Sequence, residues 1–340
     1  MLLSLLQSYA ATGAPNLSGR RARIRRMARL YVEGWDPGYG TPLEPDDALT
    51  PTIESIDTTV EMADDAWAPL DGNDDGWTDF AFVDGVRRID ARLTIDDPEA
   101  GPVPGICGTL AVGATLWDRA ARRSEVAAVR LERLALFGGG RSEVFPEVSM
   151  SPGYRTESVA DPDPDALLKH LHNQMRRAER DTAERLASEG HFVVADGPLR
   201  DLSARDTVGY IKSHRVTYLP AEHNRVISAL GAGQRTPLFT TGDYARYSWY
   251  LRLAVLPGGH SWTGVVRCEA SESLPLAEVR SLADRTAAVL PTVASEAHVD
   301  PRAPQNLVPI AGLERDLRHR MGDPMFVNRA LRAAVRQEVA

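Results

Sequence analysis

The sequence predicts an α/β protein in which a mixed sheet is flanked by helices. Three observations predict this fold class: apolar runs typical of strands follow one another from Asp79, a long amphipathic helix is expected next, and strands alternate with helices after it. Strands that first form a meander and then alternate with helices are typical of such a sheet. We expect an N-terminal arm over 1–78 and a main domain over 79–340.

The arm lacks the sustained periodicity of the main domain. Residues 1–35 are expected to be helical, and residues 36–78, rich in Pro, Gly, Asp and Trp, predict a loop-dominated segment with one strand over 54–62. At the other end of the chain, a final helix is expected over 326–339. The helices at the two chain ends have narrow apolar stripes, which would either cover the sheet or bind a second copy and a partner protein. The sequence leaves both alternatives open.

The other elements of the main domain are assigned from their hydrophobic period. Strands are expected over 80–83, 88–95, 106–117, 191–195, 208–211, 215–219, 248–255 and 261–268. Residues 126–137 fit either a further strand or a short helix. Helices are expected over 165–189, 222–230 and 276–290.

Composition and charge are those of an ordinary globular protein. The chain is 43% hydrophobic and 25% charged, which excludes disordered, collagen-like and small disulfide-linked proteins. Its 39 basic and 47 acidic residues give a net charge of −8, which excludes coating of nucleic acid by bulk positive charge but allows a local basic groove. Cys107 and Cys268 match no metal-ligand spacing. The two cysteines are too few for a disulfide framework and fit a reducing cytoplasm, and no apolar run approaches the ~18 residues of a membrane span, so we expect a cytoplasmic protein without a membrane partner.

Two expected strands run directly into an Asp-Gly pair. Phe80-Ala-Phe-Val precedes Asp84-Gly85, and Phe192-Val-Val-Ala precedes Asp196-Gly197. Because an unpaired buried charge is costly, a carboxylate after a buried strand is expected at the strand's carboxyl end, where open α/β sheets bind ligands. The alternative is that each pair only forms a turn.

The expected helix over 165–189 adds a third carboxylate. Its apolar residues fall in one arc of roughly 100°, which is typical of a core-facing stripe. Glu179 lies about 40° from Met175 at the edge of this arc, whereas Glu184 lies on the opposite side. Glu179 is therefore the acidic residue expected to face the sheet, and a surface ion pair with Arg176 or Arg180 is its alternative.

Asp84, Glu179 and Asp196 would form a site with oxygen ligands only. Such ligands are those that Mg²⁺ and Mn²⁺ prefer, and two such ions can activate a water and stabilise the leaving oxygen in phosphodiester cleavage. We therefore predict a site for Mn²⁺ or Mg²⁺ with two ions. DNA phosphates would bind to basic residues near strand ends, and each of these has solvated surface charge as its alternative: Arg87, Arg88, Lys212 and Arg215.

Several segments, in this order and at similar spacing, resemble the NurA nuclease family. They are Phe82-Val-Asp-Gly-Val-Arg-Arg, Met175-Arg-Arg-Ala-Glu, Val194-Ala-Asp-Gly-Pro-Leu, Gly209-Tyr-Ile-Lys-Ser and Tyr247-Ser-Trp-Tyr-Leu-Arg-Leu. The resemblance implies an RNase H-like core and manganese-dependent 5′→3′ resection of single- and double-stranded DNA ends. It also implies a homodimer that encloses a DNA channel and docks on a HerA-type hexameric ATPase. By position, the family's acidic residues fall on Asp84, Glu179 and Asp196.

The C-terminal part departs from the family pattern of a Tyr-Pro segment followed by a histidine. Here Val308 stands where tyrosine is expected, before Pro309. His298 and His319 flank this stretch, and neither has the usual spacing. Asn306 belongs to a variant of this element that could contact DNA. A fourth ligand or catalytic histidine is therefore not assigned.

Two other functions compete with the nuclease. A catalytically inactive adaptor would dock on the ATPase ring and regulate it, but such a protein would not need three carboxylates in one site. An actin-like or sugar-kinase ATPase would need Gly- and Thr-rich phosphate loops, and no Walker-type loop is found. The nuclease hypothesis further predicts that its four basic residues face one cavity, with the acidic residues of the arm outside it.

Overall fold

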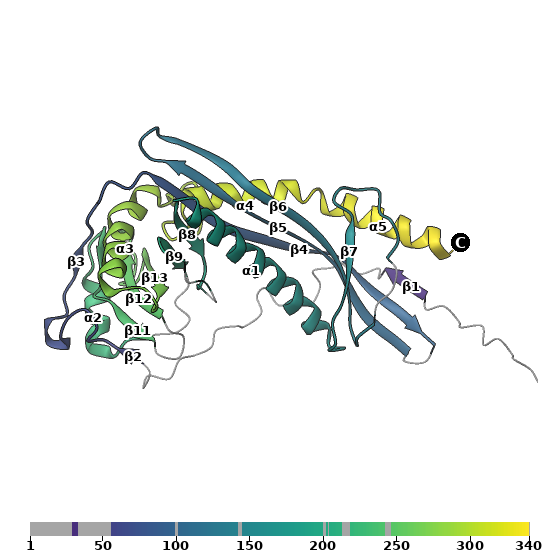
Figure 1. The fold of residues 1–340 in the computed structure, drawn as a ribbon, viewed down its shortest axis with the longest axis horizontal. Helices are drawn as coiled ribbons and strands as arrows, with labels where there is room; N and C mark the ends of the chain where they lie inside the picture. The colour runs from purple at the N-terminus through teal and green to yellow at the C-terminus, as the bar shows by residue number, and fades with distance from the viewer. Residues whose placement is uncertain are drawn as a thin grey trace, which may run out of the picture.

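The computed structural model describes residues 29–32, 56–98, 101–141, 145–199, 202, 204–212, 218–241 and 246–339. These residues form a large mixed sheet of 13 strands, and helices pack on both of its faces (Figure 1). The predicted α/β class with a mixed, helix-flanked sheet is therefore confirmed.

Three long strands form an antiparallel meander through the middle of the molecule (Figure 1). β4 (Asp79–Asp97) pairs with β5 (Gly101–Asp118), and β5 pairs with β6 (Arg123–Phe137). The short β7 (Tyr154–Ser158) adds to β6 in parallel. The segment that fitted either a strand or a helix thus lies in a strand.

β4 continues through the first Asp-Gly pair instead of ending there. Asp84 pairs with Gly113 and Gly85 pairs with Val112, so the strands expected over 80–83 and 88–95 are one element. The prediction of a strand end at Asp84 is wrong, because pairing with β5 along its whole length outweighs the local turn preference of Asp-Gly. The turn alternative is wrong for this pair as well.

The second half of the sheet is built around β8 (Phe192–Asp196), which lies between β4 and β9 (Thr207–Ile211) and is parallel to both. Four strands continue antiparallel from β9 to the edge of the sheet: β13 (Val265–Ser271), β12 (Arg246–Arg252), β11 (Phe239–Thr241) and β2 (Ile56–Asp57). Two short strands, β3 (Leu70–Asp71) and β10 (Gln234–Arg235), pair with each other. The strand expected over 54–62 is thus only β2 within its described residues, and residues 218–219 of another expected strand are not in a strand.

Five α-helices are described. α1 (Pro164–Ser188) begins after Asp163, whose side chain accepts a hydrogen bond from the Asp165 N–H, and its predicted apolar stripe is buried. α2 (Ala221–Ala229) and α3 (Leu276–Val289) agree with the expected helices. α4 (Val308–Arg320) is an additional helix, and α5 (Pro324–Val339) covers the expected C-terminal one. Among the described residues, no helix has the length and apolar character that membrane crossing requires.

The two chain ends differ from each other. Residues 29–32 form β1 (Arg29–Val32), antiparallel to the far end of β4, so the helix expected over 1–35 is wrong for these residues, and the rest of that range lies outside the described residues. Pairing with a strand that is distant in the sequence thus determines the conformation of residues 29–32. α5 buries Leu331 and Val327 with Leu93 of β4, so this helix covers the sheet.

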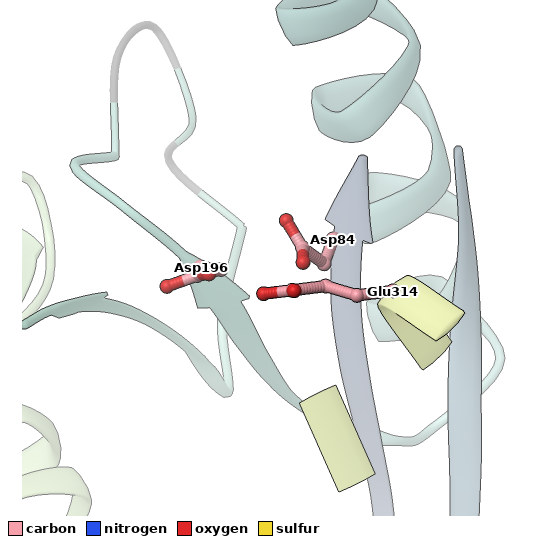
Figure 2. A group of neighbouring side chains, drawn as sticks. All are labelled: Asp84, Asp196 and Glu314. Carbon is pink, nitrogen blue, oxygen red and sulfur yellow. The ribbon is translucent and has the colours of Figure 1, made fainter. Parts of the chain in front are cut away.

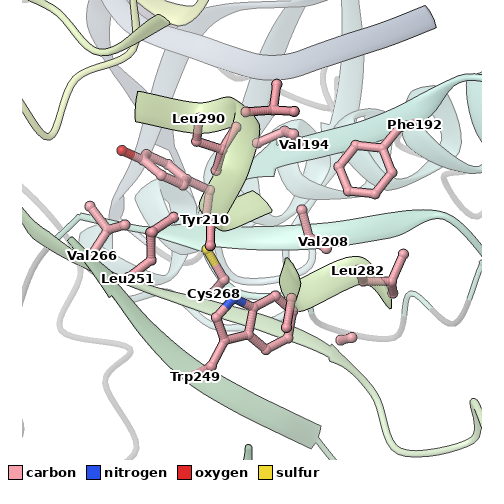
Figure 3. Packing of buried hydrophobic residues seen from close by; sticks show 14 of the residues in the cluster. Phe192, Val194, Val208, Tyr210, Trp249, Leu251, Val266, Cys268, Leu282 and Leu290 are labelled. Atoms are coloured by element: carbon pink, nitrogen blue, oxygen red, sulfur yellow. The ribbon is translucent and has the colours of Figure 1, made fainter. Parts of the chain in front are cut away.

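The alternation of side chains along β4 and β8 sorts their residues onto two faces. Phe82 and Val194 belong to the large core cluster with Leu282 of α3, and Figure 3 shows part of this cluster. Ala81 and Val83 pack instead with Leu186 of α1. Since side chains alternate, Asp84 and Asp196 lie on the face of Phe82 and Val194, and Gly85 faces α1.

Candidate metal centre

Three carboxylates meet on the face of β4 that is opposite α1. Asp84, Asp196 and Glu314 each offer one oxygen, and these oxygens lie within 4.8 Å of one another. Figure 2 shows the three side chains next to one another, on β4, at the end of β8 and on α4. We call these residues the acidic triad. Because hard divalent cations prefer carboxylate oxygens, the acidic triad could hold a metal ion.

Strand pairing brings the two aspartates together. Val83 pairs with Ala195 in the parallel ladder of β4 and β8, so the following residues, Asp84 and Asp196, lie side by side. Asp196 is the last residue of β8, and the strand end predicted there is confirmed. Directly after it, Gly197 exchanges two backbone hydrogen bonds with Tyr210, at 2.8 and 3.1 Å, which fixes where the chain leaves the strand.

α4 supplies the third carboxylate. Ile310, Leu313 and Leu317 are buried, and Glu314 lies one turn after Ile310 on the same side of the helix. Leu313 and Leu317 pack with Val86, which shares its face of β4 with Asp84. The apolar stripe of α4 therefore presents Glu314 to the two aspartates.

Burial and like charge control the ionisation of this site. Burial, followed by repulsion from Asp196 and Glu179, raises the pKa of Asp84 well above its ordinary value. Burial also raises the pKa of Asp196, against the opposing effect of the Lys212 ammonium. A divalent cation would stabilise the ionised forms of these carboxyls, since metal ligands bind in their deprotonated state.

Glu179 lies beside the acidic triad but is not a member of it. Its carboxylate lies against Gly85 on the α1 face, where a Cβ on Gly85 would be 2.5 Å from Glu179 Oε1. Burial, followed by repulsion from Asp196, raises the pKa of Glu179 to about 8. The expected convergence of Asp84, Glu179 and Asp196 thus holds for the two aspartates, while Glu179 approaches from the other face of β4. Its role as a ligand stays a prediction.

The predicted DNA-binding residues are in different environments. Arg87 is half-buried on the Glu179 side, where its charge lowers the pKa of Glu179. Arg88 lies on the opposite face and donates hydrogen bonds to Asp90, to the Met321 carbonyl at 3.2 Å and to the Gly322 carbonyl at 2.7 Å.

The expectation that these residues share one cavity is therefore wrong for Arg87 and Arg88, because neighbouring residues of a strand point to opposite faces. Arg88 instead holds the C-terminal end of α4. Lys212 is bonded to Asp196, with Nζ 2.6 Å from Oδ2. Arg215 lies outside the described residues.

The residues flanking α4 that the sequence left unassigned are now placed. Asn306 is fully buried and accepts a hydrogen bond from Lys212, so the expectation that it contacts DNA is wrong. His298 is exposed beside Glu296, and His319 is exposed near the end of α4. Neither histidine belongs to the acidic triad.

Glu314 is the site residue that sequence reasoning missed. A signal for it exists, because a glutamate within the stripe of Ile310, Leu313 and Leu317 places a carboxylate on the apolar side of a helix. The family pattern predicts a histidine, and not a glutamate, in this part of the chain. Comparison with family models and with curated proteins finds no match to this chain.

Proposed function

We propose that this protein is a metal-dependent deoxyribonuclease, a hydrolase that cleaves DNA with Mn²⁺ or Mg²⁺. The observation that carries the proposal is the acidic triad, whose oxygens lie within 4.8 Å of one another. Its donors are all carboxylates, which favours Mg²⁺ or Mn²⁺ over metals that prefer nitrogen or sulfur. The resemblance to the NurA family in the segments of Asp84, Glu179 and Asp196 selects DNA as the substrate.

Two metal ions fit this proposal better than one. The acidic triad would hold the first ion. Glu179 would contribute to a second ion beside Asp84, because its carboxylate lies against Gly85, the residue that follows Asp84. When bound, such ions would polarise the scissile phosphate and lower the pKa of a water.

The surrounding cations divide into two groups in this proposal. Lys212 and Arg302 hold ligands, since Lys212 bonds Asp196 and Arg302 bonds both oxygens of Glu314, at 3.0 and 3.1 Å. Arg87 and Arg176, whose charges lower the pKa of Glu179, would face a phosphate on the α1 side. DNA would then reach the site past Gly85, where β8 has ended and the described residues give β4 no strand neighbour on that side until Leu93.

The biological setting proposed here rests on the family resemblance. It comprises 5′→3′ resection of single- and double-stranded ends, a homodimer, and docking on a HerA-type hexameric ATPase in DNA repair or phage defence. An RNase H-like core is part of the same proposal. The competing proposal is a catalytically inactive adaptor, which an activity assay distinguishes from the nuclease.

The assay incubates end-labelled single- and double-stranded DNA with the protein in Mn²⁺, in Mg²⁺ or in EDTA. We expect cleavage in Mn²⁺, none in EDTA, and at least a 100-fold loss of cleavage for Asp84→Asn. Replacing a residue that only orients a metal ligand typically costs about 10- to 100-fold, and replacing the ligand itself should cost more. Metal-independent cleavage, or full activity of Asp84→Asn, would contradict the proposal. No cleavage even with a cognate ATPase present would support the adaptor.

A further inference from the structure

A loop outside the acidic triad holds two of its three carboxylates. Residues 294–307, which we call the clamp loop, are closed by a bridge between Ala294 and Leu307 and by a hydrogen bond from the Ser295 N–H to the Asn306 carbonyl at 3.0 Å. Within it, we propose that Asp300 is a positioning residue that sets the geometry of both Asp196 and Glu314. This inference rests on the proposed function, because it concerns the same metal site.

Two chains of hydrogen bonds, which we call arms, start at Asp300. The first runs through Asn306 and Lys212 to Asp196. Asn306 Nδ2 donates a hydrogen bond to Asp300 Oδ2 at 2.6 Å, and Asn306 Oδ1 accepts one from Lys212 Nζ at 2.9 Å. Lys212 Nζ also donates to Asp196 Oδ2. Because Asn306 is fully buried, water does not compete for its amide, and its orientation is determined by Asp300 on one side and Lys212 on the other.

The second arm runs from Asp300 to Glu314. The Arg302 backbone N–H donates to Asp300 Oδ1 at 2.8 Å, and the Arg302 guanidinium contacts both oxygens of Asp300 at 3.4 Å. The same guanidinium donates to both oxygens of Glu314. Such a planar two-point contact fixes the direction of a carboxylate as well as its distance.

Asp300 is the residue that the two arms share. Burial alone would raise its pKa, but hydrogen bonds from Asn306 and Arg302 outweigh burial and hold the pKa of Asp300 below its ordinary value. Asp300 is therefore an ionised acceptor. An asparagine at this position would place an amide N–H₂ or a weaker acceptor against the donors of Asn306 and Arg302. Both ligand-holding cations would then lose their fixed orientation.

The test compares Asp300→Asn with Glu296→Gln in the full-length protein. Glu296 lies in the clamp loop but is exposed and pairs with His298, so its replacement removes a nearby negative charge without touching either arm. Mn²⁺ affinity is measured by calorimetric titration, and the melting temperature is measured in EDTA. We expect Asp300→Asn to lower Mn²⁺ affinity about 10- to 100-fold, as is typical for residues that orient metal ligands. Glu296→Gln should retain wild-type affinity.

The melting temperature in EDTA separates positioning from simple support of the loop. We expect Asp300→Asn to melt only a few degrees below Glu296→Gln without metal, because it loses hydrogen bonds of the clamp loop but keeps the fold. Unchanged Mn²⁺ affinity in Asp300→Asn would overturn the inference, and so would an affinity loss accompanied by a large drop in metal-free melting temperature. If Glu314→Gln also leaves Mn²⁺ affinity unchanged, the proposed function fails together with the inference. If only Asp300→Asn is without effect, the proposed function stands.

Discussion

The two faces of β4 at Asp84 and Gly85 differ in how they present carboxylates. On one face, Asp84 meets Asp196 and Glu314 within 4.8 Å, and the residues come from three separate elements. On the other face, Glu179 lies against Gly85, and the charges of Arg87 and Arg176 act on it. The first face thus has enough carboxylates to hold an ion, whereas the described part of the second presents Glu179 together with Arg87 and Arg176.

This difference indicates separate tasks for neighbouring positions of a single strand. Because successive side chains of a strand point to opposite faces, an Asp-Gly pair can place a ligand on one side and leave space on the other. Gly85 provides that space, since any side chain there would collide with Glu179. We infer that the α4 face binds metal most strongly and that the α1 face completes the site.

The largest effect is expected at the α4 face. Glu314→Gln should lower DNA cleavage at least 100-fold and remove stabilisation by Mn²⁺, which would otherwise amount to about 2.7 kcal/mol at 100 times the dissociation constant. Asp316→Asn is the matched control, since Asp316 lies on the same helix and pairs with Arg320 at the surface. Melting curves with and without Mn²⁺, together with the cleavage assay, measure both variants. Equal behaviour of the two variants would remove Glu314 from the site.

A smaller effect is expected at the α1 face. Glu179→Gln should lower cleavage about 100-fold, because a ligand of the second ion is lost, while most Mn²⁺ binding by the acidic triad remains. Glu184→Gln, on the exposed side of the same helix, should resemble the wild type. Cleavage rates and Mn²⁺ titrations of the two variants test this. If Glu179→Gln loses Mn²⁺ binding as completely as Glu314→Gln, the proposed difference between the faces is wrong.

The space at Gly85 gives a prediction on stability. Gly85→Ala should destabilise the metal-free protein by about 1–3 kcal/mol, because the new Cβ would force Glu179 and Met175 to move. Gly113→Ala, in β5 opposite Asp84, brings a Cβ no closer than 3.3 Å to its neighbours and should cost less. Urea unfolding in EDTA compares the two. A larger loss for Gly113→Ala would contradict the packing argument.

The raised pKa values also give a dependence of stability on pH. In the metal-free protein, burial and repulsion from Asp196 raise the pKa of Glu179 from 4.5 to about 8. The folded state therefore binds this proton more tightly than the unfolded chain, and stability should fall as the pH rises from about 4.5 to about 8. The raised pKa of Asp84 acts in the same direction.

Urea unfolding in EDTA at several pH values within this window measures that fall. Glu179→Gln should make the fall smaller, because the group that titrates is gone. Glu184→Gln should leave it as in the wild type, and saturating Mn²⁺ should reduce it. A stability that rises across the same window would show that the carboxyl pKa values are not raised.

The sequence predicted those parts of the site that local pattern determines. Asp196 could be placed because an apolar run followed by Asp-Gly ends a strand there. Glu179 could be placed near the sheet because it borders the stripe of α1. Asp84 was selected for the same reason as Asp196, although its strand continues, because β5 pairs with it far beyond the glycine.

The remaining features depend on contacts between distant parts of the chain. Glu314 joins the site only because α4 packs on β4, and Arg88 is occupied by the end of that same helix. Residues 29–32 form a strand because β4 offers them an edge. Such pairings follow from tertiary packing, which overrides local propensity and cannot be read from one segment.

Crystals of the protein soaked in Mn²⁺ and measured at the manganese absorption edge test the central claim most directly. The account predicts an anomalous peak coordinated by Asp84, Asp196 and Glu314, lost in Glu314→Gln crystals treated in the same way. A site without manganese at saturating concentration, or manganese bound elsewhere with the acidic triad empty, would contradict it.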